Sequence, residues 1–292
     1  MNSNISVIIP IYNEELNIEY VIEGVQKYCQ NIIVVDDKST DNSYEIIKNL
    51  HNKYSEKIII LQNDKNSGIG FSVKKGMKKA LELNNDIIIK FDGDNQHLPQ
   101  DIPKFTTKLI NEKFDLVKGN RFLISDFSKP MPNLKILGNL ITTNLQKLVS
   151  GNYEISDPNN GFLALKKAVL NKVDFKKLKN NYYFENSLLI IISSMGFKIG
   201  EVPIKTIYQD EKSSIPIFTA SIKLIPTFMY FFYLRNMLNA RFNLSINSIV
   251  FFLLICLIAI NLFLNIFIVW LLCLIMLPIY LLIDIFNFYH NE

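Results

Sequence analysis

The sequence predicts an α/β protein with a mostly parallel β-sheet, joined to a C-terminal hairpin of two membrane-spanning helices. The sheet is predicted because short apolar runs alternate with amphipathic stretches through the first half of the chain, as in βαβ units. The hairpin is predicted because the C-terminal segment is almost purely apolar. The hydrophobic share of 49% in the 292 residues is therefore unevenly distributed between two parts of the chain.

The elements of the first part follow from the periodicity of the apolar residues. Runs rich in isoleucine and valine predict strands, and stretches with one apolar face predict the helices between them. The expected strands are residues 5–9, 32–35, 58–61 and 87–91, and the expected helices are residues 14–28, capped by Asn13, then 41–50 and 69–83.

Polar clusters follow three of the expected strands at the point where each strand ends. They comprise residues 10–14 (PIYNE), 36–41 (DDKSTD) and 92–97 (DGDNQH). The carboxyl ends of parallel strands form the edge at which open α/β sheets bind ligands. One such cluster could be a turn with a helix cap. Three acidic clusters at one sheet edge predict a ligand site.

The third cluster carries two carboxylates separated by a glycine. Asp92 and Asp94 can both approach a hard divalent cation, because Gly93 allows a tight chain path. Gln96 adds a neutral oxygen on the same turn. Mg²⁺ and Mn²⁺ keep open coordination positions and commonly bridge phosphate oxygens. The cluster therefore predicts a Mg²⁺ or Mn²⁺ cofactor that neutralises the charge growing on a leaving diphosphate.

Composition and motifs argue against several other classes of protein. The net charge of +4 is modest and does not indicate nucleic-acid binding. The chain has no GxxxxGK[ST] motif, which argues against a nucleoside-triphosphate hydrolase. Gly68 and Gly70 lack the dinucleotide-binding spacing and are expected to let the chain turn tightly into the following helix. The three cysteines make neither a metal-ligand spacing nor an even disulfide framework.

The apolar segment near the C-terminus predicts two membrane crossings. Between Arg241 and Asp284, 42 residues include no Asp, Glu, Lys or Arg. One helix of that length would run to about 63 Å, roughly twice the hydrocarbon core of a bilayer. Two crossings near residues 246–264 and 266–283 are therefore expected. Basic residues precede the first crossing, so both flanks of the hairpin should be cytoplasmic.

The segment before the hairpin is harder to interpret. Residues 215–234 are apolar and aromatic, but Pro216, Lys223 and Pro226 interrupt them, so we expect them to lie in the membrane plane. A third crossing here would reverse the topology. The expected organisation is a cytoplasmic catalytic domain (1–212), an interfacial segment (213–241), two transmembrane helices (242–286) and a cytoplasmic tail (287–292).

Taken in order, these segments resemble the family 2 glycosyltransferases with the GT-A fold. More closely, they resemble the polyprenyl-phosphate sugar transferases of the dolichyl-phosphate mannosyltransferase type. The matching stretches span residues 6–208 and read VIIPIYNEELNI, IVVDDKSTDNS, NSGIGFSVKKG, IIIKFDGDNQHLP, VKGNRF, DPNNGFLALKK, YYFENSLLI and GEVPIKTIY.

The resemblance implies a Rossmann-like, mixed and mostly parallel sheet with helices on both faces. It also implies an inverting transfer of one sugar from a nucleotide-diphosphate sugar to a membrane polyprenyl phosphate. The donor would be of the GDP-mannose, UDP-glucose or UDP-GlcNAc type. Membrane lipids would be further partners, and the hairpin could pack with copies of itself into a homo-oligomer.

The resemblance assigns roles to individual residues. The nucleotide sugar would be bound by Pro10, Tyr12, Glu14, Asp37, Asp92, Gly93 and Asp94, and the metal by Asp94 and Gln96. The acceptor phosphate would be bound by Arg121, Lys135, Lys205 and Lys212, with the donor diphosphate as the alternative partner of Arg121. Family members usually carry arginine near Lys135 and at the position of Leu163, and Leu163 argues against a phosphate contact there.

The nature of the acceptor decides whether the reaction needs a general base. A sugar hydroxyl requires a carboxylate base, whereas a lipid phosphate is already anionic and needs cationic groups instead. Asp157 and Glu185 are the candidate acids for either role, beside Asp94 and Arg121 as candidate catalytic residues. Alternatively, Glu185 begins a helix as a stabilising carboxylate and Asp157 shapes a loop.

Two other functions remain open at this point. One is a membrane-bound glycosyltransferase that extends a lipid-linked or cell-surface glycan, against which a missing base would count. The other, from a different class, is a non-catalytic membrane scaffold with a degenerate transferase domain. The intact Asp37, Asp92, Asp94 and Gln96 argue against the scaffold.

Overall fold

A seven-stranded mixed sheet forms the centre of the molecule. The computed structural model describes residues 4–54, 56–83, 85–124, 133–207, 227–237, 250–251, 253–254, 256 and 267–290. In this part of the chain the strand order is β3-β2-β1-β4-β6-β5-β7. The strands are β1 (Ile5–Ile11), β2 (Asn31–Asp36), β3 (Ile58–Gln62), β4 (Ile87–Lys90), β5 (Leu116–Asn120), β6 (Leu163–Lys166) and β7 (Ile199–Pro203).

The pairing confirms the mixed, mostly parallel sheet. β1, β2, β3 and β4 run parallel to one another, and β5 runs parallel to β7. β6 alone among these strands is antiparallel to its neighbours, β4 and β5. The central strands are buried on both faces, which explains why their sequences are continuous apolar runs.

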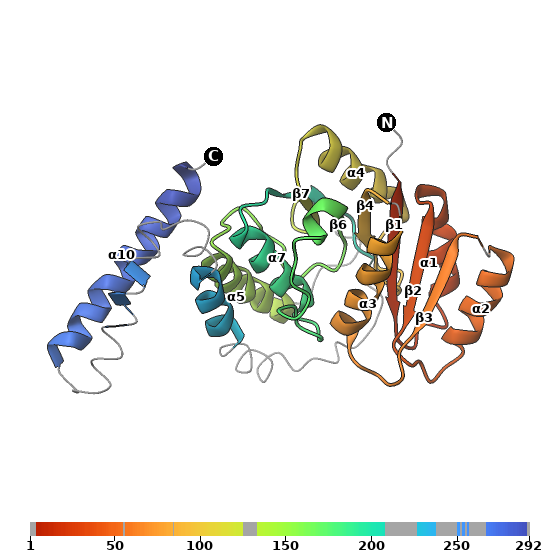
Figure 1. Ribbon diagram of the computed structural model, residues 1–292, viewed down its shortest axis with the longest axis horizontal. Helices are drawn as coiled ribbons and strands as arrows, with labels where there is room; N and C mark the ends of the chain where they lie inside the picture. The colour runs from red at the N-terminus through yellow and green to blue at the C-terminus, as the bar shows by residue number, and fades with distance from the viewer. Residues whose placement is uncertain are drawn as a thin grey trace.

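Helices cover both faces of this sheet, as predicted (Figure 1). Helices α1 (Ile18–Val25), α2 (Ser43–Lys53) and α4 (Ile102–Asn111) pack on one face, and α3 (Ile69–Glu82) and α7 (Phe184–Ser194) pack on the other. Shorter or peripheral helices are η1 (Gln26–Tyr28), η2 (Pro99–Asp101), α5 (Asn133–Ser150), α6 (Lys167–Leu170) and α10 (Phe267–His290).

The first helix begins later than the sequence predicts. It starts at Ile18 rather than at residue 14, and Asn13 does not cap it. Asn13 instead adopts a left-handed conformation with φ of 57°, and its Oδ1 accepts a hydrogen bond of 2.8 Å from the Thr40 backbone. The residues after β1 therefore bind the loop after β2, which keeps them at the ligand edge of the sheet.

The two glycines at the start of α3 serve a turn and a close approach of two backbone segments. Gly68 has a φ of 93°, which a side chain would make unfavourable, so the expected tight turn is confirmed. A Cβ at Gly70 would collide with the backbone of residues 179–181. The start of α3 therefore packs directly on the segment that precedes α7.

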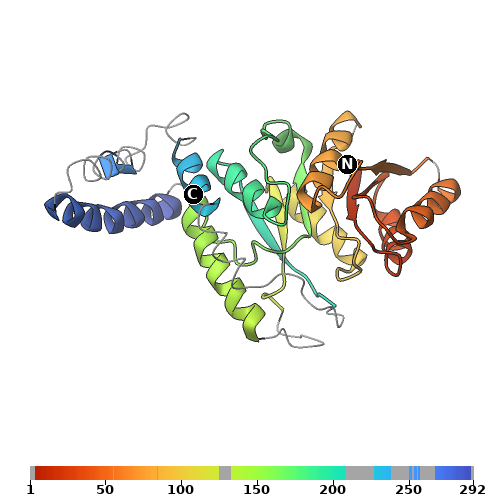
Figure 2. The ribbon, with the colours of Figure 1, turned by 90° about the horizontal axis from the view of Figure 1, so that it is seen from below.

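The C-terminal part of the chain lies on the side of the molecule away from β3 (Figure 2). Residues 227–237 are helical and pack through Phe228 and Phe231 against α5 and α7. No helix within the described ranges is long and apolar enough to cross a membrane. Most of the first predicted crossing, and residues 213–226 and 238–241 of the predicted interfacial segment, lie outside those ranges. The membrane hairpin stays a prediction.

Candidate active site

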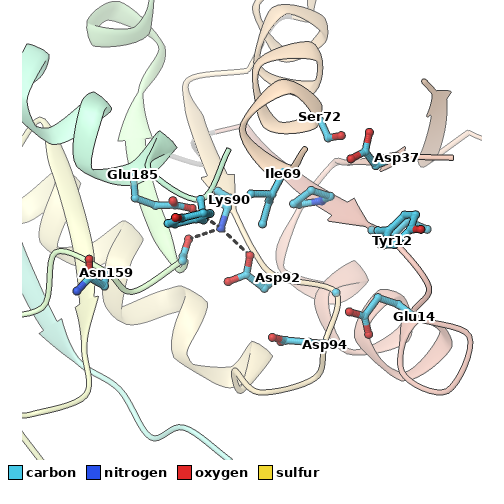
Figure 3. Close-up of a pocket in the computed structure, with 15 residues that line it drawn as sticks. Tyr12, Glu14, Asp37, Ile69, Ser72, Lys90, Asp92, Asp94, Asn159 and Glu185 are labelled. Carbon is cyan, nitrogen blue, oxygen red and sulfur yellow. Dashed lines mark hydrogen bonds and ion pairs between the residues drawn. The ribbon is translucent and has the colours of Figure 1, made fainter. Parts of the chain in front are cut away.

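A cavity of about 450 Å³ opens at the carboxyl ends of β1, β2 and β4 (Figure 3). Every residue predicted to bind the nucleotide sugar lines it, and so does Glu185. The three polar clusters thus converge as expected, although their role in binding stays a prediction. The lining consists of Pro10, Ile11, Tyr12, Glu14, Asp37, Ile69, Ser72, Lys90, Asp92, Gly93, Asp94, Asn159, Gly161, Tyr182 and Glu185.

Asp37 and Tyr12 form the wall of the cavity nearest β2. Both carboxylate oxygens of Asp37 are engaged: Oδ1 accepts hydrogen bonds from Asn63 Nδ2 at 2.7 Å and Ser67 N at 2.8 Å, and Oδ2 accepts one from Gly68 N at 2.8 Å. Asp37 therefore fixes the loop that precedes α3. Tyr12 is 43% exposed and can offer its aromatic ring to a planar ligand.

Lys90 lies in the middle of the cavity floor, and the sequence reasoning missed it. It is the last residue of β4 and only 1% exposed. Its Nζ lies 2.6 Å from Asp92 Oδ1, 2.8 Å from Glu185 Oε1 and 3.1 Å from the Gly161 carbonyl oxygen (Figure 3). Burial alone would lower the pKa of Lys90, but the two carboxylates overcome it and raise that pKa. The sequence feature that could have revealed Lys90 is a lysine at the end of an otherwise apolar strand.

The two carboxylates of the metal prediction have opposite pKa shifts. Burial would raise the pKa of Asp92, but Lys90 and His97 together lower it below its usual value. Burial and the negative charge of Asp92 raise the pKa of Asp94 to about 6. Asp94 Oδ1 accepts a hydrogen bond of 3.1 Å from the Gln96 backbone. The repulsion between these carboxylates is one that a nearby cation would relieve.

The donor set fits a hard cation that shares its coordination with a ligand. Nowhere in the described ranges do three or more His, Cys, Asp or Glu side chains form a metal cluster. Mg²⁺ is usually held by one or two carboxylates and completes its coordination with water and phosphate oxygens. Asp94 provides such an oxygen at the cavity surface, whereas Gln96 is not among the residues that line the cavity.

Arg121 and Asp157 form a bidentate ion pair outside the cavity lining. Arg121 Nε lies 2.7 Å from Asp157 Oδ2, and its Nη2 lies 2.7 Å from Oδ1. Asp157 is 1% exposed, and its backbone N–H donates to Glu201 Oε1 at 2.9 Å. This fork fixes the guanidinium plane of Arg121. Lys205 is described but does not line the cavity; the Lys135 side chain and Lys212 lie outside the described residues.

A second buried lysine was also missed. Lys90 and Lys118 both pair in register with Leu163 of β6, one from β4 and the other from β5. Lys118 is fully buried, donates a hydrogen bond to the Asn160 carbonyl oxygen and has a pKa that burial lowers to about 8. Leu163, which stands where the resemblance expected an arginine, is therefore flanked by two lysines on adjacent strands.

Comparison with known proteins identifies the class to which this fold and site belong. The profile of Glycosyl transferase family 2 matches residues 6–174. The chain belongs to this family and is a glycosyltransferase. Both the predicted family and the predicted enzyme class are confirmed.

Two relatives show which proteins of the family this chain is similar to. It is 37% identical to the UDP-N-acetylglucosamine–dolichyl-phosphate N-acetylglucosaminyltransferase of Methanococcus voltae, over 70% of this chain and 86% of the relative. It is 31% identical to the dolichol-phosphate mannosyltransferase of Pyrococcus furiosus, over 68% of this chain and 55% of the relative.

A solved structure shares the fold at low sequence identity. Glucosyl-3-phosphoglycerate synthase from Mycobacterium tuberculosis, in complex with Mn²⁺ and UDP-glucose, superposes with a TM-score of 0.58 and 20% identity. The match covers 79% of this chain and 79% of that chain. The similarity confirms the GT-A-like fold of the catalytic part.

Proposed function

We propose that this glycosyltransferase moves one sugar from a nucleotide-diphosphate sugar to a membrane polyprenyl phosphate, with inversion. The observation that carries the proposal is the pairing of both candidate bases with cations. Glu185 forms an ion pair with Lys90, and Asp157 forms a bidentate ion pair with Arg121. A hydroxyl acceptor needs a carboxylate that takes its proton, whereas a phosphate acceptor is already anionic. Paired carboxylates therefore favour the phosphate.

Under this proposal, one group of residues binds the sugar donor and another binds the acceptor phosphate. Tyr12 and the cavity wall fixed by Asp37 would hold the nucleoside of the donor, and Asp94 with Gln96 would hold Mg²⁺ or Mn²⁺ near its diphosphate. When bound, the metal neutralises charge on the leaving diphosphate. The guanidinium of Arg121, oriented by its partner, would bind the acceptor phosphate bidentately, and Lys135, Lys205 and Lys212 would add positive charge around it.

The names of the relatives support the lipid acceptor and guide the choice of donor. One relative is named for UDP-N-acetylglucosamine and dolichyl phosphate, and another for dolichol phosphate and mannose. We therefore propose UDP-GlcNAc as the first donor to test, with GDP-mannose and UDP-glucose as the other donors of the proposed class.

The lipid product provides the direct test. Membranes that contain the protein, supplied with labelled donor, Mn²⁺ and undecaprenyl or dolichyl phosphate, should yield a labelled product that partitions into organic solvent. Mild acid should release the sugar, because the new bond is a glycosyl phosphate. Membranes with the Asp94→Asn variant serve as the control. An acid-stable glycan product would favour the glycan-extending alternative, and the absence of any lipid-linked product would refute the proposal.

We also propose that residues 242–286 form the membrane hairpin and that the catalytic domain lies on the cytoplasmic face. Arg235 precedes the apolar segment and Asp284 follows it, and Arg235 Nη1 lies 3.1 Å from Asp284 Oδ2. Their contact supports an even number of crossings between them. Tyr153 also donates to Asp284 Oδ2 at 3.0 Å. Because residues 227–237 pack on α5 and α7, the catalytic domain offers this segment an alternative to a third crossing.

Cysteine labelling tests this topology. In a cysteine-free background, a cysteine at Asn265 should react with a membrane-impermeant maleimide in intact cells. A cysteine at Asn291 should react only after lysis. Labelling of both positions from the same side would contradict the hairpin, and the reversed pattern would contradict the cytoplasmic orientation.

A further inference from the structure

Lys90 occupies a place where a charge is costly. It ends the otherwise apolar strand β4, and its side chain is 1% exposed. A buried ammonium group is tolerated only when hydrogen-bonding and charged partners replace the water it loses. The partners of Lys90 therefore indicate why a lysine stands there.

The ammonium group has a partner for each of its hydrogens. It carries three N–H donors, and three acceptors lie within hydrogen-bonding distance: Asp92 Oδ1 at 2.6 Å, Glu185 Oε1 at 2.8 Å and the Gly161 carbonyl oxygen at 3.1 Å. With these donors engaged, Lys90 has none left for a substrate. It can influence the reaction only through the groups that it holds.

The three acceptors come from segments that line different parts of the cavity. Asp92 follows β4, Gly161 precedes β6, and Glu185 lies in the first turn of α7. Figure 3 shows Lys90 between Asp92 and Glu185, with Tyr12 on the far side of the cavity from Glu185. The packing is tight, because a Cβ at Gly161 would collide with Asp92 Oδ2. One cation thus joins the predicted donor side to the remainder of the cavity.

We propose that Lys90 is a positioning residue of the sugar transfer, whose ammonium group fixes Asp92 on the donor side and Glu185 on the acceptor side in a single arrangement. The assignment of the acceptor side rests on the proposed function. The contrasting role is purely structural: a cation that only balances buried negative charge and has no effect on either substrate in the folded enzyme.

The test requires a variant that removes the cation without leaving excess buried charge. Lys90→Met alone leaves the Asp92 and Glu185 carboxylates without the ammonium group that lies between them, which can unfold the protein. The double variant Lys90→Met/Glu185→Gln loses one positive and one negative charge, so the net charge of the group of three is unchanged. Lys90→Gln/Glu185→Gln is the substitute if the first double variant does not melt cooperatively.

The measurements separate positioning from folding. We expect the full-length double variant to melt like the wild type. Its dissociation constant for UDP or GDP with Mn²⁺, measured calorimetrically without acceptor, should rise about 10-fold, and kcat should fall about 100-fold, as when a supporting partner is lost. The half-saturating polyprenyl phosphate concentration should also rise. A smaller folded fraction would lower the rate, but it would change neither the dissociation constant for the nucleotide nor the half-saturating concentration of polyprenyl phosphate.

Glu185→Gln alone is the matched control, because it keeps the Lys90–Asp92 pair. It should leave nucleotide affinity within about twofold of the wild type. A folded double variant with wild-type nucleotide affinity and a rate within about threefold of the wild type would overturn the positioning role. Nucleotide binding needs no acceptor, so a wild-type enzyme that makes no lipid product would refute the proposed function and leave the comparison of nucleotide affinities intact.

Discussion

Replacing Asp94 by asparagine should lower the rate of sugar transfer about 100- to 1000-fold, as when a group that stabilises transition-state charge is removed. Asp94 lines the cavity beside Asp92, and burial together with that neighbour raises its pKa to about 6. Asparagine keeps the size of the side chain and one oxygen but removes the charge that attracts a hard cation. Rates measured over a range of Mn²⁺ and Mg²⁺ concentrations should show that most of the metal stimulation is lost.

Asp115→Asn is the matched control for this experiment. Asp115 precedes β5 at the end of the sheet opposite the cavity, where its Oδ2 accepts a hydrogen bond of 3.0 Å from the Lys198 backbone. Its loss should leave the metal dependence unchanged. If Asp94→Asn kept wild-type metal dependence and more than about a tenth of the wild-type rate, the metal role of Asp94 would be wrong.

The convergence of the three polar clusters on one cavity could be predicted because its signals are local in the sequence. Asp37, Asp92 and Asp94 each lie shortly after the end of an apolar strand, and parallel strands bring such ends to one edge. The start of α1 was missed for a related reason. Asparagine is a common helix-capping residue, but the Asn13 side chain accepts a hydrogen bond from the loop after β2 instead. The periodicity of apolar residues carries no information about such a contact between loops.

The remaining site could not be predicted because its contacts join distant segments. Lys90 meets the carbonyl of a residue 71 positions away, and Arg121 meets a carboxylate 36 positions away. The replacement of the expected arginine by Leu163 suggested a lost positive charge. Only the antiparallel register of β6 reveals that Lys90 and Lys118 flank that position. A register between strands far apart in sequence is set by the whole sheet.

Replacing either Arg121 or Asp157 should lower the rate of sugar transfer about 100-fold, because misplacing a binding group by about 1 Å can cost that much. Arg121→Met removes the group proposed to bind the acceptor phosphate. Asp157→Asn leaves the guanidinium without the fork that orients it. Asp157→Asn should also lower the free energy of unfolding by about 3 kcal/mol, since it removes one partner of a largely buried ion pair. Chemical denaturation of Asp157→Asn and the wild type would measure that loss of stability.

The double variant Arg121→Met/Asp157→Asn decides what Asp157 does. If Asp157 acts only by orienting Arg121, the double variant should be about 100-fold slower than the wild type, no worse than either single variant, because residues that act as a unit are not additive. If Asp157 were an independent base for a hydroxyl acceptor, the losses would multiply to about 10,000-fold. Rates measured at saturating donor and metal, corrected for the folded fraction, distinguish the outcomes. A multiplicative loss would restore the base that a sugar acceptor requires and would remove the main reason for preferring a phosphate.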